Sequence, residues 1–290
     1  MRNKGNKPVW DDYWKLNKPE NNLYEISKRD NYYSLLKYLI VKGMVWEQFR
    51  APVKIVEIGC GSGIRTLTLL MEFPDRIREV IFFDQSECAL STVKESLKWL
   101  PHELHKKVSF IQGDIFQMPF EKDSIDIAWN EGVVEHFSGT DRADIFKCIY
   151  DVVKPEGFYL CLVPNFLNLF LISRNFLMKK TNRWPYGYQR EFSIFELHNK
   201  MRDAGFEIMC SSGVDSVAAL KLLLEEIISL LAGNRKREAS SGIEEAVVNK
   251  SPAKIKQIFQ KLRLISWRME MGTPYGRLLG RDIGVCSRKH

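Results

Sequence analysis

The chain contains the stretch Glu57-Ile58-Gly59-Cys60-Gly61-Ser62-Gly63, which places three glycines at alternate positions directly after an apolar run. Glycine has no Cβ, so such a turn can bend sharply and let its backbone approach a ligand. The turn follows a predicted buried strand at 53–57 and precedes a predicted helix at 64–73, whose free N–H groups would point into the same space. A ligand that carries a carboxylate or a phosphate would suit this turn.

The spacing of the glycines is G-x-G-x-G, because position 64 is Ile. Dinucleotide-binding proteins have G-x-G-x-x-G at the corresponding place. Asp84 lies at the end of a second predicted strand, about twenty residues beyond the last glycine, where a carboxylate can accept hydrogen bonds from both hydroxyls of a ribose. Capping of the next helix is the alternative interpretation of Asp84. The turn and Asp84 together favour a nucleoside ligand.

The third and fourth predicted strands also end in polar side chains. Asp114 follows the third strand and could accept a hydrogen bond from an adenine amino group, with Ile115 forming an apolar wall. Asn130 and Glu131 follow the fourth strand. In open α/β sheets ligands bind outside the carboxyl ends of the strands. Four neighbouring strand ends therefore offer groups that suit one nucleoside.

From residue 53 onward, short apolar runs alternate with amphipathic stretches, which predicts a parallel sheet with helices on both faces. Predicted strands lie at 53–57, 80–84, 108–111, 124–129, 158–163, 206–210 and 282–287. Predicted helices lie at 64–73, 87–99, 142–153 and 195–203. We expect a helical cap at 1–50, a core at 51–213, a helical insertion that acts as a lid or an oligomerisation surface at 214–272, and a final strand at 273–290.

The composition, with 45% hydrophobic and 27% charged residues, is typical of a soluble globular protein. The net charge of +7 keeps nucleic acid and anionic membrane surfaces open as partners, but the basic residues are scattered along the chain. The six cysteines form no CxxC pair, and their spacing suits neither a zinc site nor a disulfide framework. We therefore expect the protein to be located in a reducing cytoplasm. The apolar stretch 158–178 is interrupted by Pro164, Asn165, Asn168 and Arg174, so we expect a strand, a turn and a helix there and no membrane span.

Together these motifs resemble the class I S-adenosylmethionine-dependent methyltransferases, over roughly residues 50–210 and the last ten residues. The resemblance is carried by residues 57–63, 84, 113–114, 124–129, 132–136, 153–157 and 197–206. It implies a Rossmann-like three-layer sandwich with a seven-stranded, mostly parallel sheet, and S-adenosyl-L-methionine as the cofactor. It also implies that the glycine turn holds the methionine part, the acid after strand two the ribose and the acid after strand three the adenine. The predicted cofactor-binding residues are Glu57, Gly59, Cys60, Gly61, Gly63, Asp84, Gln85, Asp114, Ile115 and Asn130.

Methyl transfer from a sulfonium is an in-line displacement, so the protein mainly has to position the acceptor and exclude water. A base is needed only where the acceptor must lose a proton. His136, which follows strand four, is the predicted base, and Glu131 is the second candidate. The alternative interpretation of His136 is that it only shapes the loop. Related enzymes bind a metal through a Glu-x-x-Glu-His motif. This chain has Gly132 in place of the first Glu, so one ligand is absent and no metal is predicted.

The sequence gives fewer indications of the acceptor than of the cofactor. The aromatic residues Trp184, Tyr186 and Tyr188 could line an acceptor pocket or only pack a lid. We expect a small-molecule acceptor, hydrophobic or aromatic, methylated at oxygen or nitrogen. The alternatives are an RNA- or protein-directed methyltransferase, with nucleic acid the less favoured partner, and a non-catalytic cofactor-binding module. A homodimer is left open.

Overall fold

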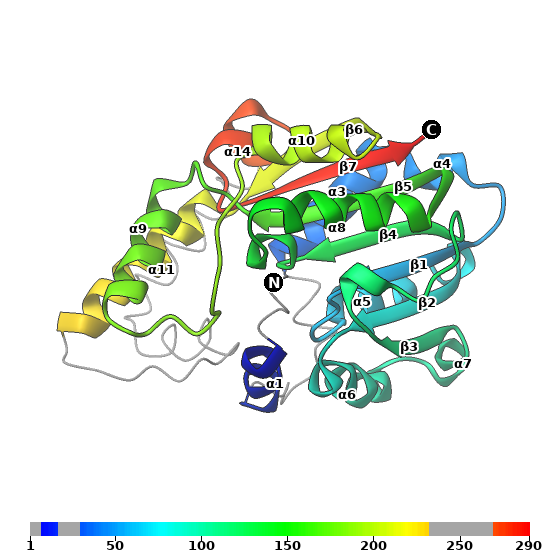
Figure 1. Ribbon diagram of the computed structural model, residues 1–290, viewed down its shortest axis with the longest axis horizontal. Helices are drawn as coiled ribbons and strands as arrows, with labels where there is room; N and C mark the ends of the chain where they lie inside the picture. Colours follow the sequence, from blue (N-terminus) through cyan, green and yellow to red (C-terminus); the bar gives the residue numbers. More distant parts are fainter. Residues whose placement is uncertain (1–6, 17–29, 232–268) are drawn as a thin grey trace.

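The structure is a computed structural model that describes residues 7–16, 30–231 and 269–290. Its strands are β1 (Val53–Ile58), β2 (Ile77–Asp84), β3 (Val108–Gln112), β4 (Ile125–Glu131), β5 (Val153–Pro164), β6 (Phe206–Val214) and β7 (Asp282–Lys289). They form one sheet in the order β3-β2-β1-β4-β5-β7-β6, in which only β7 runs antiparallel to its neighbours (Figure 1). The predicted Rossmann-like α/β fold with a seven-stranded, mostly parallel sheet is confirmed.

Two hydrophobic cores lie on opposite faces of the sheet. Successive residues of β1 show why: Ile55 packs into one core and Val56 into the other, as the two-residue period of a strand requires. Because both faces are covered, the central strands carry apolar side chains on both of their faces. One face is covered by α3 (Asn31–Lys42), α4 (Val45–Gln48), α5 (Ile64–Glu72), α6 (Glu87–Ser96) and α7 (His102–His105). The other is covered by α8 (Gly139–Val152) and α10 (Ile194–Asp203).

The boundaries of several elements differ from the prediction, β4 and β5 among them. β4 extends through Glu131, two residues further than expected, so Asn130 and Glu131 belong to the strand. β5 begins at Val153, directly after α8 and five residues before its predicted start. A register shift between Ile125 and Ile127, together with a positive φ of 63° at Glu156, accommodates these residues within the strand.

Three helical elements stand beside the sheet. The first helix, α1 (Lys7–Leu16), lies next to α6. The second element is a pair of helices, α9 (Leu169–Lys180) and α11 (Ser216–Leu231), which pack on each other and project from one end of the molecule (Figure 1). The third, α14 (Pro274–Leu279), precedes β7 and packs on β6. Among the described residues no helix is long and apolar enough to cross a membrane.

The predicted strand, turn and helix over 158–178 correspond to β5, residues 165–168 and α9. Of the predicted helical insertion at 214–272, the structure describes 214–231 and 269–272, and residues 232–268 lie outside its described ranges. The role of this insertion as a lid or an oligomerisation surface stays a prediction.

Candidate functional site

A pocket of about 220 Å³ opens at the carboxyl ends of β1, β2, β3 and β4. This is the edge at which parallel α/β sheets bind their ligands. Two tryptophans of α1 form part of the pocket wall. Of the residues predicted from the sequence, the pocket is lined by Glu57, Gly59, Cys60, Gly61, Asp84, Gln85, Asp114, Ile115, Glu131 and His136.

The glycine turn has the backbone that its sequence predicts. Gly59, Gly61 and Gly63 have φ angles of +66°, +51° and +63°, a region that residues with a Cβ rarely adopt. Gly59 and Gly61 line the pocket, whereas Gly63 precedes α5 and is packed against Phe82 and Val93. Gly63 therefore allows close contact between helix and strand and does not face the ligand space.

Asp84 fixes the shape of the turn from the neighbouring strand. Its Oδ2 accepts a hydrogen bond of 3.1 Å from the Gly61 N–H, and its Oδ1 accepts one of 2.9 Å from the Ser86 N–H. The cap of α6 is Ser86, whose side chain accepts from the Ala89 N–H. Burial raises the pKa of Asp84 to about 6, against the opposing effect of the backbone N–H groups. A carboxylate has about four acceptor positions, so Asp84 retains capacity for a ligand.

Glu57 is a buried acid in the wall of the pocket. Its side chain is 6% exposed, and its Oε2 has no hydrogen-bond partner in the described part of the chain. Burial raises the pKa of Glu57 to about 8. An unsatisfied buried oxygen is costly, so this atom is suited to receive a hydrogen-bond donor from a bound molecule.

Asp114 and Ile115 lie where the third strand gives way to a short 3-10 helix, Ile115–Gln117. Asp114 begins this helix, and its Oδ1 accepts a 3.0 Å hydrogen bond from the Phe116 N–H. The Ile115 side chain is buried at the wall of the pocket. The structure therefore brings this acid and its apolar neighbour to the same cavity as the glycine turn.

His136 lies in a 3-10 helix, Val134–His136, on the opposite side of the pocket. Its Nδ1 is 2.9 Å from the carbonyl oxygen of Tyr188, which can only accept, so Nδ1 carries the proton in this contact. Nε2 then carries the lone pair, and it lies 3.9 Å from Oε1 of Glu135. Burial lowers the pKa of His136 to about 4, so the ring is neutral at physiological pH.

Glu131, the second predicted base, is engaged in an ion pair. Its Oε2 lies 3.2 Å from Arg65, which also contacts Asp30 at 2.6 Å. Burial raises the pKa of Glu131 to about 7, and Arg65 opposes this shift. Arg65 lines the pocket as well and was not predicted. It lies in the first turn of α5, two residues after Gly63, but nothing in the local sequence reveals its distant acidic partners.

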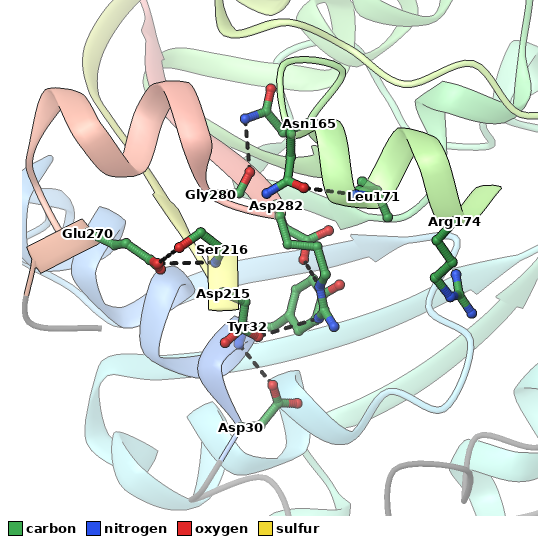
Figure 2. A network of polar contacts seen from close by, with 12 residues as sticks. Asp30, Tyr32, Asn165, Leu171, Arg174, Asp215, Ser216, Glu270, Gly280 and Asp282 are labelled. Atoms are coloured by element: carbon green, nitrogen blue, oxygen red, sulfur yellow. Dashed lines mark hydrogen bonds and ion pairs between the residues drawn. The ribbon is translucent and has the colours of Figure 1, made fainter. Parts of the chain in front are cut away.

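Asp30, which pairs with Arg65, also belongs to a larger polar network, part of which Figure 2 shows. Asp30 begins α3 by accepting a hydrogen bond from the Tyr32 N–H. The Tyr32 ring has the Arg65 guanidinium 4.8 Å from its centre and the Arg281 guanidinium 5.0 Å away. Arg281 in turn pairs with Asp282, at the start of β7. The network thus connects the pocket to the last strand of the sheet.

Asn130 does not line the pocket. Its side chain is fully buried, and its Oδ1 accepts a hydrogen bond from the Tyr159 hydroxyl of β5. Because β4 is longer than predicted, the alternation of side chains directs Glu131 to the pocket and Asn130 away from it. The structure therefore does not bring Asn130 together with the other predicted cofactor-binding residues.

An aromatic cluster encloses the His136 side of the pocket. Trp10 packs edge-on against His136 with a ring distance of 4.8 Å, and Trp14 lies over Gly61. Tyr186 contacts Trp10 and Tyr13 at ring distances of 6.5 and 5.8 Å. The sequence predicted a helical cap over residues 1–50, but it could not show which residues the cap would cover.

Chains with related sequences were found for the region that carries the pocket. The family model described as methyltransferase domain matches residues 56–161. A Mycolicibacterium smegmatis protein assigned as an S-adenosylmethionine-dependent methyltransferase is 27% identical over 166 residues, which are 57% of this chain and 56% of the relative. Demethylmenaquinone methyltransferase from Lactococcus lactis is 29% identical over 134 residues, which are 46% of this chain and 51% of the relative.

The matched regions thus span about half the length of these relatives. A solved structure, an S-adenosylmethionine-dependent methyltransferase from Thermotoga maritima, has the same fold with a TM-score of 0.52 and 14% identity, covering 97% of this chain and 100% of its own. Residues 56–161 of the chain therefore form a methyltransferase domain, and the fold is that of an S-adenosylmethionine-dependent methyltransferase. The cofactor of this methyltransferase is S-adenosyl-L-methionine. The glycine turn and the unsatisfied Glu57 oxygen fit such a molecule.

Proposed function

We propose that this methyltransferase transfers the methyl group of S-adenosyl-L-methionine to an oxygen or nitrogen atom of a small-molecule acceptor. The observation that carries the proposal is the composition of one pocket. It joins a glycine turn and two strand-end acids, which suit a nucleoside, to a neutral buried histidine under an aromatic cover. A pocket that served only to bind a nucleoside would have no need of the histidine.

The donor would be held by the strand ends. The turn at Gly59 and Gly61 lets the methionine part approach the backbone, and the Glu57 carboxyl faces its ammonium group. Asp84, with Gln85 beside it, would accept hydrogen bonds from the ribose hydroxyls. Asp114 would accept one from the adenine amino group while Ile115 packs on the ring.

The bound donor supplies a methyl group that is already activated by the positive sulfonium. The protein then has to align the acceptor and exclude water. Trp10 and Trp14 carry out the exclusion, because they place apolar surface over the pocket. His136 is suited to remove the acceptor proton, since Nδ1 donates to the Tyr188 carbonyl and the ring lone pair is therefore on Nε2.

The aromatic cluster supports a hydrophobic or aromatic acceptor. Trp10, Tyr13, Trp184 and Tyr186 are in ring contact beside His136, and such rings bind flat or apolar molecules by stacking. One relative is named for a small-molecule acceptor, demethylmenaquinone. Neither observation identifies one compound, so the proposal is limited to this class.

A labelled-cofactor assay tests the proposed reaction. The protein and methyl-labelled cofactor are added to a cell extract, which is then separated into small molecules, RNA and protein. We expect the label in the small-molecule fraction, extractable into organic solvent. Label in RNA or protein would overturn the proposed acceptor class. If the protein binds the cofactor but transfers no label, it is a cofactor-binding module and not an enzyme.

A further inference from the structure

The helices α9 and α11 form an arm that extends beyond the sheet on the side where its strands carry the pocket (Figure 1). The arm is joined to the core by side chains at its base. Asn168 caps α9 by accepting from the Leu171 N–H, and it donates to the Leu279 carbonyl. The base of the arm is thus anchored, while the C-terminal ends of both helices lie away from the sheet.

The burial pattern of α11 is the reverse of that of a soluble amphipathic helix. Glu226 is fully buried and pairs with Arg183 at 2.8 Å, and Ser229 accepts a 3.0 Å hydrogen bond from the same guanidinium. The opposite face is apolar and exposed. It consists of Leu224, Ile227, Ile228 and Leu231, which are 39–84% exposed and follow each other at helical spacing.

The neighbouring helix α9 extends the same kind of surface. Leu169 and Phe176 are 75% and 60% exposed, and Lys179 and Lys180 follow at its last turn. The Lys180 ammonium lies 5.6 Å from the centre of the Phe176 ring. Within the described ranges neither lysine forms an ion pair. The arm therefore combines exposed apolar side chains with positive charge that has no acidic partner there.

These features favour one kind of occupant. In a two-fold contact between copies, the same patch faces itself, so the lysines of both copies would gather without counter-charge. Glu225, the other acid near this face of α11, has a side chain that is only 11% exposed and is already paired with Lys221. Anionic lipid headgroups would supply the missing charge, and the acyl boundary would receive the apolar side chains. We infer that the α9–α11 arm docks on the surface of an anionic lipid bilayer.

The docked arm would lie near the entrance to the pocket. The segment that follows α9 carries Tyr186, which contacts Trp10, and Tyr188, whose carbonyl accepts from His136. A hydrophobic acceptor dissolved in the bilayer would thus reach the pocket along this segment, a consequence that rests on the proposed function. The docking itself does not depend on that function.

Flotation of the full chain with lipid vesicles tests the inference. We expect binding to vesicles of phosphatidylglycerol and phosphatidylcholine, and much weaker binding to phosphatidylcholine alone. The double variant Ile228→Ser, Leu231→Ser should weaken binding at least about tenfold, since two exposed apolar side chains are lost. Lys179→Gln and Lys180→Gln should each weaken it about fivefold, and added salt should have the same effect.

Val41→Ser is the matched control, because Val41 is 62% exposed, close to the 64% of Ile228, but lies on α3 outside the arm. Equal losses in the control and in the arm variants would overturn the inference, as would absence of vesicle binding by the unaltered chain. Light scattering that shows a dimer dissociated by the Ile228 and Leu231 changes would assign the surface to a second copy instead. Affinity for S-adenosylhomocysteine, measured in each variant, separates these outcomes from a failure of the proposed function.

Discussion

The two sides of the pocket are built in different ways. On the donor side, each contact comes from the end of a strand and the few residues that follow it, as in the glycine turn at 57–63 and at Asp84. On the acceptor side, the surface is assembled from α1, the 3-10 helix with His136, and the segment around Tyr186. The first side is local in sequence, whereas the second joins segments more than a hundred residues apart.

This difference has a physical origin. The proposed donor is a single molecule of fixed shape. The end of a strand and the turn after it can hold the same groups around such a molecule. The acceptor side has to exclude water and fit a different molecule in each enzyme, which loops and added helices on a rigid scaffold can do. The donor side is therefore expected to respond to substitution through affinity, and the acceptor side through rate.

The largest expected effect is on the acceptor side. We expect His136→Gln to lower kcat about a hundredfold or more, because the base is lost while the pocket keeps its volume. Affinity for S-adenosylhomocysteine, measured by calorimetry, should change little. His198→Gln on α10 is the control. A large loss of donor affinity in His136→Gln would break the proposed division between the two sides.

The next effect is on the donor side. Asp84→Ala should weaken binding of S-adenosylhomocysteine about thirtyfold, or ~2 kcal/mol, because the ribose hydroxyls and the Gly61 N–H lose a charged acceptor. Asp75→Ala, an exposed acid outside the pocket, should leave the affinity unchanged. Calorimetric titration decides between these outcomes. An Asp84→Ala chain with unaltered affinity would show that the ribose lies elsewhere.

Arg142 joins pieces of the acceptor side, and its substitution should have a smaller effect. Its guanidinium is 1% exposed and donates to the carbonyls of Phe137, Glu135 and Arg190. Arg142→Lys keeps the charge but cannot reproduce the planar fork, so the free energy of unfolding should fall by ~1–2 kcal/mol.

The readout that separates positioning from stability is a fall in kcat of Arg142→Lys at a temperature where the variant is fully folded. The exposed Arg190→Lys is the matched control, since Arg190 pairs with the same Glu196. Unfolding by denaturant and steady-state kinetics provide the two measurements. A variant that loses stability but keeps the full rate would show that Arg142 does not position the acceptor side for the reaction.

The smallest expected effect is the pH dependence of stability. Burial raises the pKa of Glu57 and Glu135 to about 8, so the folded chain binds more protons than the unfolded chain between their ordinary pKa and about 8. Their stabilising contribution is complete below the unfolded pKa and is lost as the pH rises through about 8. The lowered pKa of His136 acts in the opposite sense, but only below its ordinary value of 6.5.

Without ligand, the Tm should therefore fall by a few degrees from about pH 6.5 to about pH 9. Thermal denaturation across this range provides the measurement. Glu57→Gln should flatten the curve, and Glu121→Gln on the surface should not. A Tm that rises with pH would contradict the direction of both carboxyl shifts.

The donor side was largely predictable from the sequence, and the acceptor side was not. The turn glycines and Asp84 are recognisable because their chemistry follows from backbone geometry and from the alternation of strands and helices. Asn130 was misplaced because it was predicted to follow the fourth strand, whereas it lies within β4, where successive side chains point to opposite faces. Arg65 was missed because its partner Asp30 becomes a neighbour only when separate segments pack together.

The position of β7 has a consequence for how the protein forms. β7 comes last among the strands in the chain, yet it lies between β5 and β6, and β6 pairs with no other strand in the sheet. During synthesis, β6 therefore has no place to bind until the ribosome has made the residues of β7. Until then the nascent chain exposes the unpaired edge of β5, a surface on which strands of other chains can add. Folding yield should thus depend on the speed at which the residues from β6 to β7 are translated.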